Sequence, residues 1–219
     1  MKSMAIRPEV LPFVAVTILV FGTLAVVVAP GLCLLAGCVL IGYFLYFFRD
    51  PERFSPPEND VIVAGADGTV AAITDVREDK YLNADCVRIS IFLSLFDVHV
   101  NRAPIAGGSS FLGYFPGQHL FTFREKSSDV NQHNKILIIG ERTRCLVCQI
   151  VGPVCRRVAY WPDHNQRVSV ALGQRIGMMK FGSRLDLYLP TADVNVLVKL
   201  GTTVRAGETI VARLKGENG

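Results

Sequence analysis

The sequence predicts a mainly β domain, a sandwich or barrel, that follows an N-terminal transmembrane helical hairpin. Residues 10–48 are a run of 39 without a charged side chain, in a chain of 219 residues that is 50% hydrophobic. After residue 50 the apolar residues instead form short segments rich in Val, Ile and Leu, bounded by Gly, Pro, Asn or Asp. We therefore expect two domains, an anchoring hairpin over residues 1–48 and a β domain over residues 49–219.

The uncharged run is too long for a buried helix or a cleavable signal peptide. It divides into Leu11–Val28 and Gly31–Phe48, each 18 residues long, which is close to the shortest helix that crosses a bilayer core. Ala29-Pro30 separates the two segments, and proline interrupts a helix because it lacks a backbone donor. One long tilted span, or a re-entrant segment at the interface, is the alternative.

Positive charges flank both ends of the predicted hairpin. Lys2 and Arg7 precede it, while Arg49 and Arg53 follow it. Basic residues next to membrane spans favour the cytoplasmic side, so both ends are expected to be cytoplasmic. This predicts a protein of the cell (inner) membrane whose β domain faces the cytoplasm.

The β domain is predicted from its short apolar segments, after a linker that contains Ser55-Pro56-Pro57. The predicted strands are Val61–Val63, Gly68–Val76, Val87–Leu93, Ile136–Ile139, Leu146–Val151, Val158–Trp161 and Leu185–Leu189.

Two further stretches repeat a pattern of strand, glycine turn and strand. One runs from Val168–Val170 through Gly173, and the other from Thr202–Val204 through Gly207. The pattern predicts two hairpins and resembles lipoyl-type barrels, although any hairpin-rich β protein has similar stretches.

The charge of the β domain argues against nucleic-acid binding, and the spacing of its cysteines argues against a metal site. Residues after position 48 carry 21 basic and 18 acidic side chains, a net charge too small for a nucleic-acid-binding protein. Such a surface is compatible with attraction to anionic lipid headgroups and equally with an ordinary solvated surface. Cys86, Cys145, Cys148 and Cys155 lie in strand-like segments and indicate a reducing compartment. The spacing of Cys145 and Cys148 is metal-like, but no second pair accompanies it, so we predict no metal site.

The dipeptide Gly182-Ser183 lies between two apolar segments. Such a dipeptide is ordinarily a turn, because glycine adopts positive φ readily and serine bonds to nearby backbone. The alternative is self-cleavage, since the Ser183 hydroxyl lies one peptide plane from the Gly182 carbonyl. The dipeptide alone does not decide between the two.

Four motifs occur in a fixed order. They are Ala-Gly-Ala-Asp-Gly at 64–68, Phe-Asp-Val-His-Val-Asn-Arg-Ala-Pro at 96–104, Asn-Gln-His-Asn at 131–134 and Phe-Gly-Ser-Arg at 181–184. This order resembles the phosphatidylserine decarboxylases, in particular the short, membrane-anchored form of that proenzyme, over residues 49–215. Four ordered motifs are far more specific than any one of them.

The resemblance implies a catalytic Asp67–His99–Ser183 triad. In such a triad a histidine removes the proton of the serine hydroxyl, and a carboxylate keeps the histidine in the required tautomer. Taken alone, His99 would more often be a hydrogen-bonded core or surface histidine.

The resemblance also implies that the chain cuts itself between Gly182 and Ser183. The products would be a β chain, residues 1–182, and an α chain, residues 183–219, that stay associated. Ser183 would become a pyruvoyl group, the electron sink that forms a Schiff base with the substrate amine, so that neither a metal nor pyridoxal phosphate is needed. The implied reaction converts phosphatidylserine into phosphatidylethanolamine.

The sequence departs from the longer members of this family at two places. Arg102 stands where they have a second histidine, so roles divided between two histidines would fall on His99. At 131–134 they usually have Asn-Glu-Arg, which leaves Gln132 and His133 without an assigned role. Arg102 and Arg184 are the candidate substrate-binding residues, while Arg88 and Lys126 are phosphate partners on charge alone.

A non-enzymatic protein is the alternative hypothesis. The same chain could be a membrane-anchored, lipoyl-like β-barrel adaptor, and a denaturing gel would distinguish the two, because only the proenzyme gives two fragments. As an enzyme, its expected partners are phosphatidylserine, the lipid bilayer and its own two fragments. A homo-oligomer is compatible with the sequence.

Overall fold

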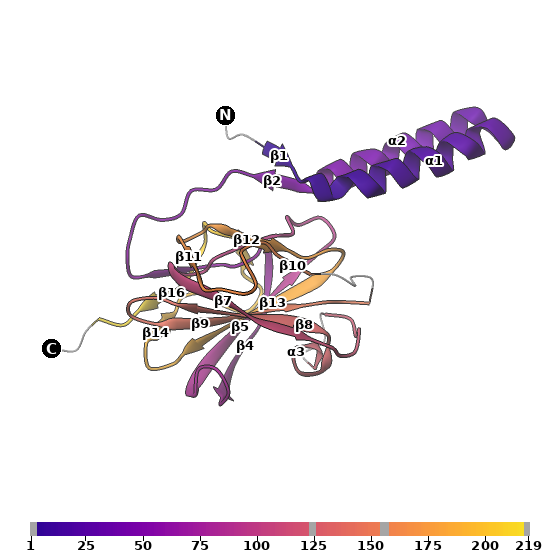
Figure 1. Cartoon of the computed structure of the whole chain (residues 1–219). Coiled ribbons are helices and arrows are strands. Elements are labelled where there is room, and N and C mark those ends of the chain that lie inside the picture. The colour runs from indigo at the N-terminus through magenta and orange to yellow at the C-terminus, as the bar shows by residue number, and fades with distance from the viewer. Residues whose placement is uncertain (1–3, 123–125, 154–157, 217–219) are drawn as a thin grey trace. The chain divides into compact units, whose positions relative to one another are not determined.

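The computed structural model describes residues 4–122, 126–153 and 158–216 and divides into two compact units, Met1–Glu52 and Arg53–Gly219 (Figure 1). Lys2 and Cys155 lie outside the described residues. The second unit is built almost entirely from strands, and the first from two helices, which confirms the predicted fold class.

The N-terminal unit is a helical hairpin. A short 3-10 helix η1 (Pro8–Val10) leads into α1 (Leu11–Val27), and α2 (Pro30–Phe47) follows. Pro30 is the first residue of α2, a position that tolerates proline because the first amide of a helix has no intrahelical partner. The alternative of one continuous span is therefore wrong. Both helices are long and apolar enough to cross a membrane.

The two helices pack closely, and the ends of the hairpin are joined. A Cβ built on Gly37 would lie 3.0 Å from the Cβ of Phe21, so the glycine permits the close approach of the helices. At the base, β1 (Met4–Ile6) pairs antiparallel with β2 (Arg49–Pro51), and the Arg7 amide donates to the Phe48 carbonyl (2.9 Å). The entry to α1 and the exit from α2 are thus held side by side.

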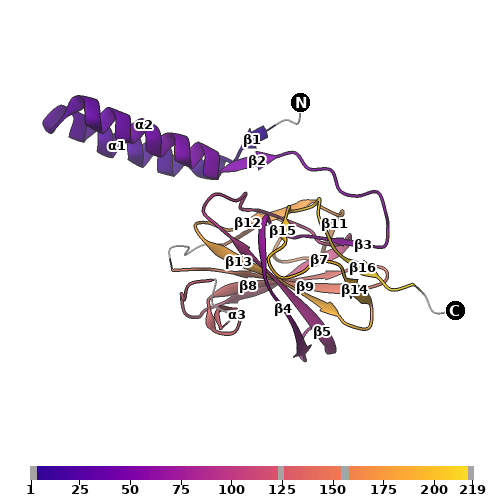
Figure 2. The same cartoon turned by 180° about the vertical axis from the view of Figure 1, so that it is seen from behind.

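Over its described residues, the second unit contains one eight-stranded and two three-stranded sheets, all built from antiparallel pairs. Figure 2 shows the strands of this unit from behind. The large sheet has the order β11-β7-β8-β9-β13-β5-β4-β15, and the small sheets are β10-β12-β6 and β14-β16-β3. The strands are β3 (Val61–Val63), β4 (Gly68–Glu78), β5 (Ala84–Leu93), β6 (Val100–Arg102), β7 (Gly107–Phe115), β8 (His133–Ile139), β9 (Arg144–Ile150), β10 (Ala159–Tyr160), β11 (Val168–Val170), β12 (Arg175–Met178), β13 (Ser183–Pro190), β14 (Val194–Val196), β15 (Thr203–Val204) and β16 (Ile210–Leu214). One four-residue helix, α3 (Ser127–Val130), precedes β8.

The large sheet separates two hydrophobic clusters. Because side chains alternate along a strand, Leu185 and Leu187 of β13 lie in the main core, where they join Ile89 and Ile91 of β5. The opposite face carries a smaller cluster around Leu82. β13 lies between β5 and β9 and is fully buried over most of its length.

The seven predicted strands are all present, but the two predicted hairpins are wrong. The strands beside Gly173 pair elsewhere, β11 with β7 and β12 with β10 and β6. The strands on either side of Gly207 do not pair with each other either: β15 pairs with β4, and β16 pairs with β14 and β3. Both glycines do form turns, with φ of +71° and +74°. The turns lie against each other, since a Cβ on Gly173 would be 3.4 Å from the Gly207 Cα, and they direct the strands into different sheets. The likeness to lipoyl-type barrels stays a prediction.

Candidate active site

The backbone before Ser183 has an unusual conformation. Phe181 has φ of +56° and Gly182 has φ of +74°. A left-handed conformation costs a residue with a Cβ roughly 1–2 kcal/mol, so Phe181 is strained. Ser183 begins β13, is completely buried, and its Oγ lies 3.5 Å from the Lys180 carbonyl oxygen, a long contact for a hydroxyl donor. Strain of this kind persists where the surrounding structure imposes it, often at functional sites.

His99 is completely buried and tied to the segment that leads to Ser183. Its Nδ1 lies 3.0 Å from the Asp97 carbonyl oxygen, and its own carbonyl accepts a hydrogen bond from the Met179 amide (3.1 Å). The Asp97 carboxylate in turn accepts from the amide and hydroxyl of Ser94 (2.8 and 2.7 Å). A proton on Nδ1 that donates to Asp97 leaves Nε2 as the basic nitrogen.

A buried amide network connects the His99 segment to the strand beside Ser183. Gln149 of β9 donates to the Asn101 side chain (2.8 Å) and accepts from Asn134 (3.3 Å). Gln149 is the register partner of Leu185, which shares its sheet face with Ser183 two residues earlier. His99 comes two residues before Asn101. The Gln149 side chain therefore links the segment that contains His99 to the sheet face that carries Ser183.

Asp67 lies at the same end of the sheet. It directly precedes β4, whose Thr69 pairs with Phe92 of β5. The next residue of β5, Leu93, pairs with Ser183. Its carboxylate is buried and accepts hydrogen bonds from Arg53 Nη2 (2.7 Å) and the Ala206 amide (2.8 Å). The Asp97 carbonyl beside His99 Nδ1 is a partner that sequence reasoning did not identify.

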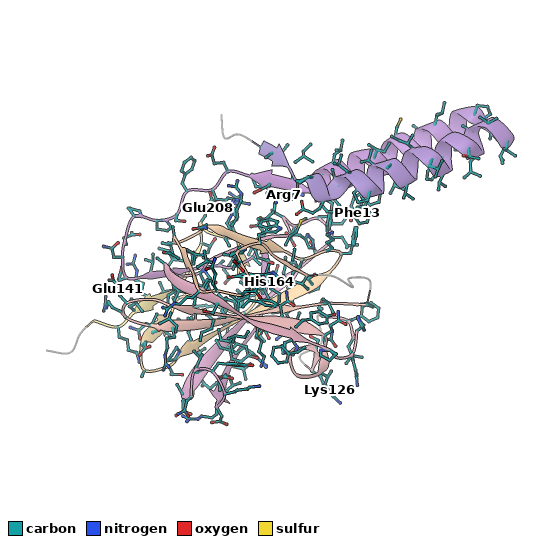
Figure 3. All side chains as sticks on the ribbon, viewed as in Figure 1. Arg7, Phe13, Lys126, Glu141, His164 and Glu208 are labelled. Atoms are coloured by element: carbon teal, nitrogen blue, oxygen red, sulfur yellow. The ribbon has the colours of Figure 1, made fainter. Side chains whose placement is uncertain are left out.

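Arg102 lines a basic groove next to Asp67. The groove has a volume of about 580 Å³ and includes Arg53, Arg102 and Arg175 among its lining residues. Arg102 donates to the Gly173 carbonyl (3.0 Å), and Arg53 also bonds Glu208 (2.8 Å). Figure 3 shows Glu208 and Lys126 on opposite sides of the β domain. Lys126 is therefore not placed to share a ligand with this groove.

Comparison with known proteins identifies the family. A family model described as phosphatidylserine decarboxylase matches residues 40–212. A phosphatidylserine decarboxylase proenzyme of Symbiobacterium thermophilum is 38% identical over 216 residues, 98% of each chain. The proenzymes of Carboxydothermus hydrogenoformans and Desulfotalea psychrophila are 40% and 37% identical and cover 81% and 78% of this chain and 83% and 79% of their own. The chain belongs to the phosphatidylserine decarboxylase family.

In this member of the phosphatidylserine decarboxylase family, Arg184, the other candidate substrate-binding arginine, forms hydrogen bonds within the sheet. Arg184 is buried, and its guanidinium donates to Asp186 (2.9 Å) and to the hydroxyl of Ser90 (2.6 Å). Arg88 is also buried on this face, beside Tyr188. Burial is the main cause of the raised pKa of the Tyr188 hydroxyl. These contacts hold β13 in place.

The motif at 131–134 supports the site from outside. The Asn131 side chain donates to the carbonyls of Leu120 (2.7 Å) and Val151 (2.8 Å). His133 Nδ1 lies 2.7 Å from the Asn131 carbonyl oxygen, and its ring stacks on Phe115 at 5.2 Å. Burial is the main cause of its lowered pKa. The departure from the sequence of longer phosphatidylserine decarboxylases therefore falls on residues that pack locally.

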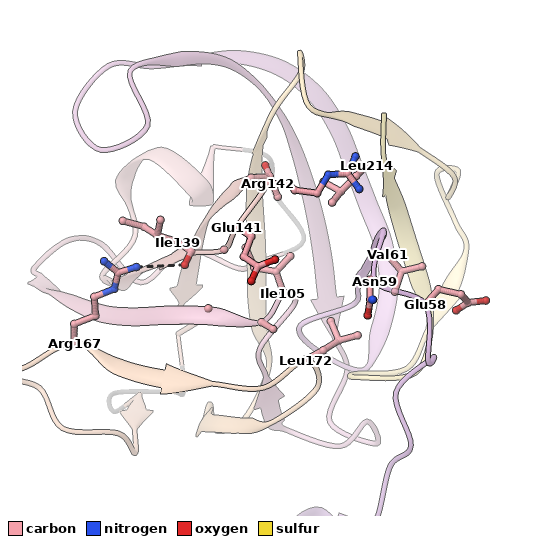
Figure 4. Close-up of a pocket in the computed structure, with 14 residues that line it drawn as sticks. Glu58, Asn59, Val61, Ile105, Ile139, Glu141, Arg142, Arg167, Leu172 and Leu214 are labelled. Carbon is pink, nitrogen blue, oxygen red and sulfur yellow. Dashed lines mark hydrogen bonds between the residues drawn. The ribbon is translucent and has the colours of Figure 1, made fainter. Parts of the chain in front are cut away.

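A pair of cysteines and a second cavity lie apart from this site. Cys145 and Cys148 lie on opposite faces of β9, Cys145 in the main core and Cys148 in the smaller cluster, so this pair does not bind one metal ion. A cavity of about 690 Å³ is lined by Glu141, Arg142 and Arg167 among others (Figure 4). It lies where β9 begins, whereas the cleavage site lies where β9 ends, about 20 Å away at strand spacing.

Proposed function

We propose that this protein decarboxylates phosphatidylserine to phosphatidylethanolamine after cutting its own chain between Gly182 and Ser183. One observation carries the proposal. A buried serine follows two residues with positive φ at the start of β13, at the end of the sheet that also holds Asp67 and the His99 segment. This arrangement occurs in a chain of the phosphatidylserine decarboxylase family.

The cleavage needs only groups of the chain and water. His99 Nε2 takes the hydroxyl proton of Ser183, and Oγ bonds to the Gly182 carbonyl carbon as the peptide C–N bond breaks and its nitrogen gains a proton. Loss of the Cα proton of residue 183 then breaks the Cβ–Oγ bond and frees Gly182 as a carboxylate. Water replaces the amine of the resulting dehydroalanine as ammonia, which leaves a ketone. Asp67 is assigned the orientation of the base.

The surroundings of residue 183 fit a pyruvoyl group. Nothing lies within 4 Å of a Cβ built on Gly182, so the new carboxyl end has room to move away. Residue 183 itself is completely buried at the start of a central strand. A pyruvoyl group there supplies the electron sink for decarboxylation. His99 holds the proton for the substrate Cα, and Arg102 is assigned to the lipid phosphate.

Both fragments are expected to remain together after cleavage. The α chain, residues 183–219, contains β13 to β16, and the β chain, residues 1–182, contains their partners. β13 pairs with β5 and β9, β15 with β4, and β16 with β3. Separation of the fragments would expose the main core on both sides.

A membrane location supports a lipid substrate. We assign α1 and α2 as a hairpin in the cell membrane, with the β domain on the cytoplasmic side. Leu95 and Phe96, in the loop that precedes His99, expose 44% and 67% of their surface. Apolar side chains beside the site suit contact with the acyl region of the bilayer.

Replacement of the nucleophile tests the proposal. Wild-type protein should give two fragments with a ketone mass at residue 183, whereas Ser183→Ala should stay one chain, because no oxygen nucleophile remains. A denaturing gel and intact-mass measurement report both. Cleavage of Ser183→Ala after residue 182 would contradict the proposal, and an intact wild-type chain would favour the non-enzymatic adaptor.

A further inference from the structure

Gly152 lies against the carbonyl group of the bond that is proposed to break. It comes two residues after β9 ends, and a Cβ built on it would be closer than 3.0 Å to the Gly182 carbonyl oxygen and 3.6 Å from the carbonyl carbon. Between these two distances lies Thr122 Cγ2, at 3.4 Å from the same Cβ. Real Cβ atoms essentially never come within 3.0 Å of another heavy atom, so any side chain here would displace the Gly182 carbonyl.

The glycine is required for space and not for backbone conformation. Gly152 is not among the described glycines with positive φ, so an L-residue could adopt its conformation. The atom that the Cβ would meet belongs to the backbone of residue 182, which cannot rotate aside like the end of a long side chain. The missing side chain therefore sets where the Gly182 oxygen lies.

The backbone around Gly152 is also fixed. The Val151 amide donates to the Gln132 carbonyl (3.0 Å), and the Val151 carbonyl accepts from Asn131 (2.8 Å). On the other side, Arg184 pairs with Ile150, which holds the start of β13 against the end of β9. These contacts hold the chain neighbours of Gly152 and Gly182 in place before cleavage.

We propose that Gly152 is a positioning residue for self-cleavage. It leaves the space that seats the Gly182 carbonyl oxygen, and so determines which face of the carbonyl carbon is open to Ser183 Oγ. As Oγ bonds to that carbon, the carbonyl electron pair moves onto the oxygen, so the seated atom is the one that gains negative charge. This inference rests on the proposed self-cleavage.

The test is Gly152→Ala in the full-length chain. We expect uncut protein to accumulate, with cleavage at least tenfold slower than in wild type and a melting temperature within a few degrees of uncut Ser183→Ala. Gly140→Ala is the matched control. Its Cβ would also press on backbone carbonyls, at 2.9 Å from Ala106 and 3.2 Å from Thr143, but Gly140 precedes β9 at the far end of the sheet. It should be cut at the wild-type rate.

Hydroxylamine separates a positioning role from a later defect, because it cleaves the ester that follows Oγ attack. Hydroxylamine should release the 1–182 fragment of Gly152→Ala at least tenfold more slowly than that of wild type, since the ester forms slowly. Release or spontaneous cleavage at the wild-type rate, while Ser183→Ala stays intact, would overturn the inference and leave the proposed function standing. Cleavage of Ser183→Ala would instead remove the proposed function.

A second variant applies if Gly152→Ala does not fold. Thr122→Ile enlarges the side chain whose Cγ2 lies beside this space, and Thr122→Val keeps the original size. Slower cleavage in Thr122→Ile than in Thr122→Val supports the inference, and equal rates overturn it.

Discussion

His99 is oriented by its own loop. The Asp97 carbonyl lies 3.0 Å from Nδ1, and the Asp97 carboxylate closes the loop through two hydrogen bonds from Ser94. This contact favours the tautomer with its proton on Nδ1, which leaves Nε2 to accept a proton. The proposed roles need a neutral imidazole for cleavage and an imidazolium for protonation of the substrate.

His99→Ala should therefore affect both steps. Loss of a general base slows a reaction by roughly 10²- to 10⁴-fold, so uncut protein should accumulate on a denaturing gel. Any fraction that matures slowly should decarboxylate poorly when its activity is divided by its ketone content.

Arg102→Ala is the control for this change. A guanidinium stays protonated and cannot act as a base at neutral pH, so this variant should be cut normally and show a raised KM for the lipid. Normal maturation of His99→Ala would remove the proposed base. Failure of cleavage in Arg102→Ala would move an essential role to the basic groove.

The sequence predicts a serine and a histidine for the candidate site but not the residues that shape it. Gly152-Pro153 has the pattern of an ordinary turn, and only the fold brings Gly152 to the Gly182 carbonyl. The positive φ of Phe181 is equally invisible, because a phenylalanine adopts it only when the surrounding structure imposes it. Residue type predicts chemistry, whereas close contacts depend on the whole fold.

At the scale of single elements, β13 contains a buried ion pair next to the cleavage site. Asp186 is completely buried, and Arg184 both bonds it (2.9 Å) and reaches Ser90 of the neighbouring strand (2.6 Å). Removal of one partner from such a pair leaves an uncompensated charge, whereas replacement of both by apolar residues is often tolerated.

Arg184→Met should therefore destabilise the protein by about 3–5 kcal/mol, and Arg184→Met with Asp186→Leu should recover much of that loss. Both are compared in an uncut Ser183→Ala background, so that stability is measured apart from processing. Thermal unfolding gives the comparison. A double variant no more stable than Arg184→Met would show that the pair is needed for its hydrogen bonds and not for charge balance.

His133 makes the β7–β8 ribbon sensitive to acid. Its pKa is lowered in the folded protein, mainly by burial, so the unfolded chain binds more protons below neutral pH and stability falls as the pH decreases through the unfolded value of about 6.5. His133→Gln should lose less stability than the parent between pH 7.5 and pH 5. Thermal unfolding of both proteins at the two pH values measures this difference, and equal losses would contradict the prediction.

The sequence predicted most elements but not all of their pairings. The helical hairpin could be predicted because the length of an apolar segment and a proline between two segments are both visible in the local sequence. β7 was not predicted, because Gly107-Gly108-Ser109-Ser110 has the composition of a turn. Gly107 is needed there for its φ of +152° and for the close approach of the Ile139 carbonyl, both set by pairing with β8. The paired residues of β7 and β8 lie 18 apart (Phe115 and His133) to 31 apart (Gly108 and Ile139) in the sequence, so their pairing leaves no local signal.

At the scale of the whole molecule, the two ends of the helical hairpin are held together by paired strands. β1 and β2 pair across the base of the hairpin, with Ile6 opposite Arg49, so the two ends of the membrane segment cannot lie on opposite sides. Arg7 also lies 3.7 Å from Asp50, an ion pair across the same base. A substrate lipid in the cytoplasmic leaflet would then be reached without transfer across the bilayer.

The topology of the hairpin gives the last prediction. Arg7, Arg49 and Arg53 flank the two helices, and positive flanks favour the cytoplasm, so both termini should be cytoplasmic. Reporters that are active only in the cytoplasm should work when fused before Met1 and after Gly219, and reporters that need export should fail at both places. Deletion of α2, Pro30–Phe47, is the matched control, because a single remaining span should carry the C-terminal reporter to the opposite side of the membrane from the N-terminus. Export of the C-terminal reporter in the intact chain would contradict the hairpin, since the paired strands β1 and β2 would have to separate across the bilayer.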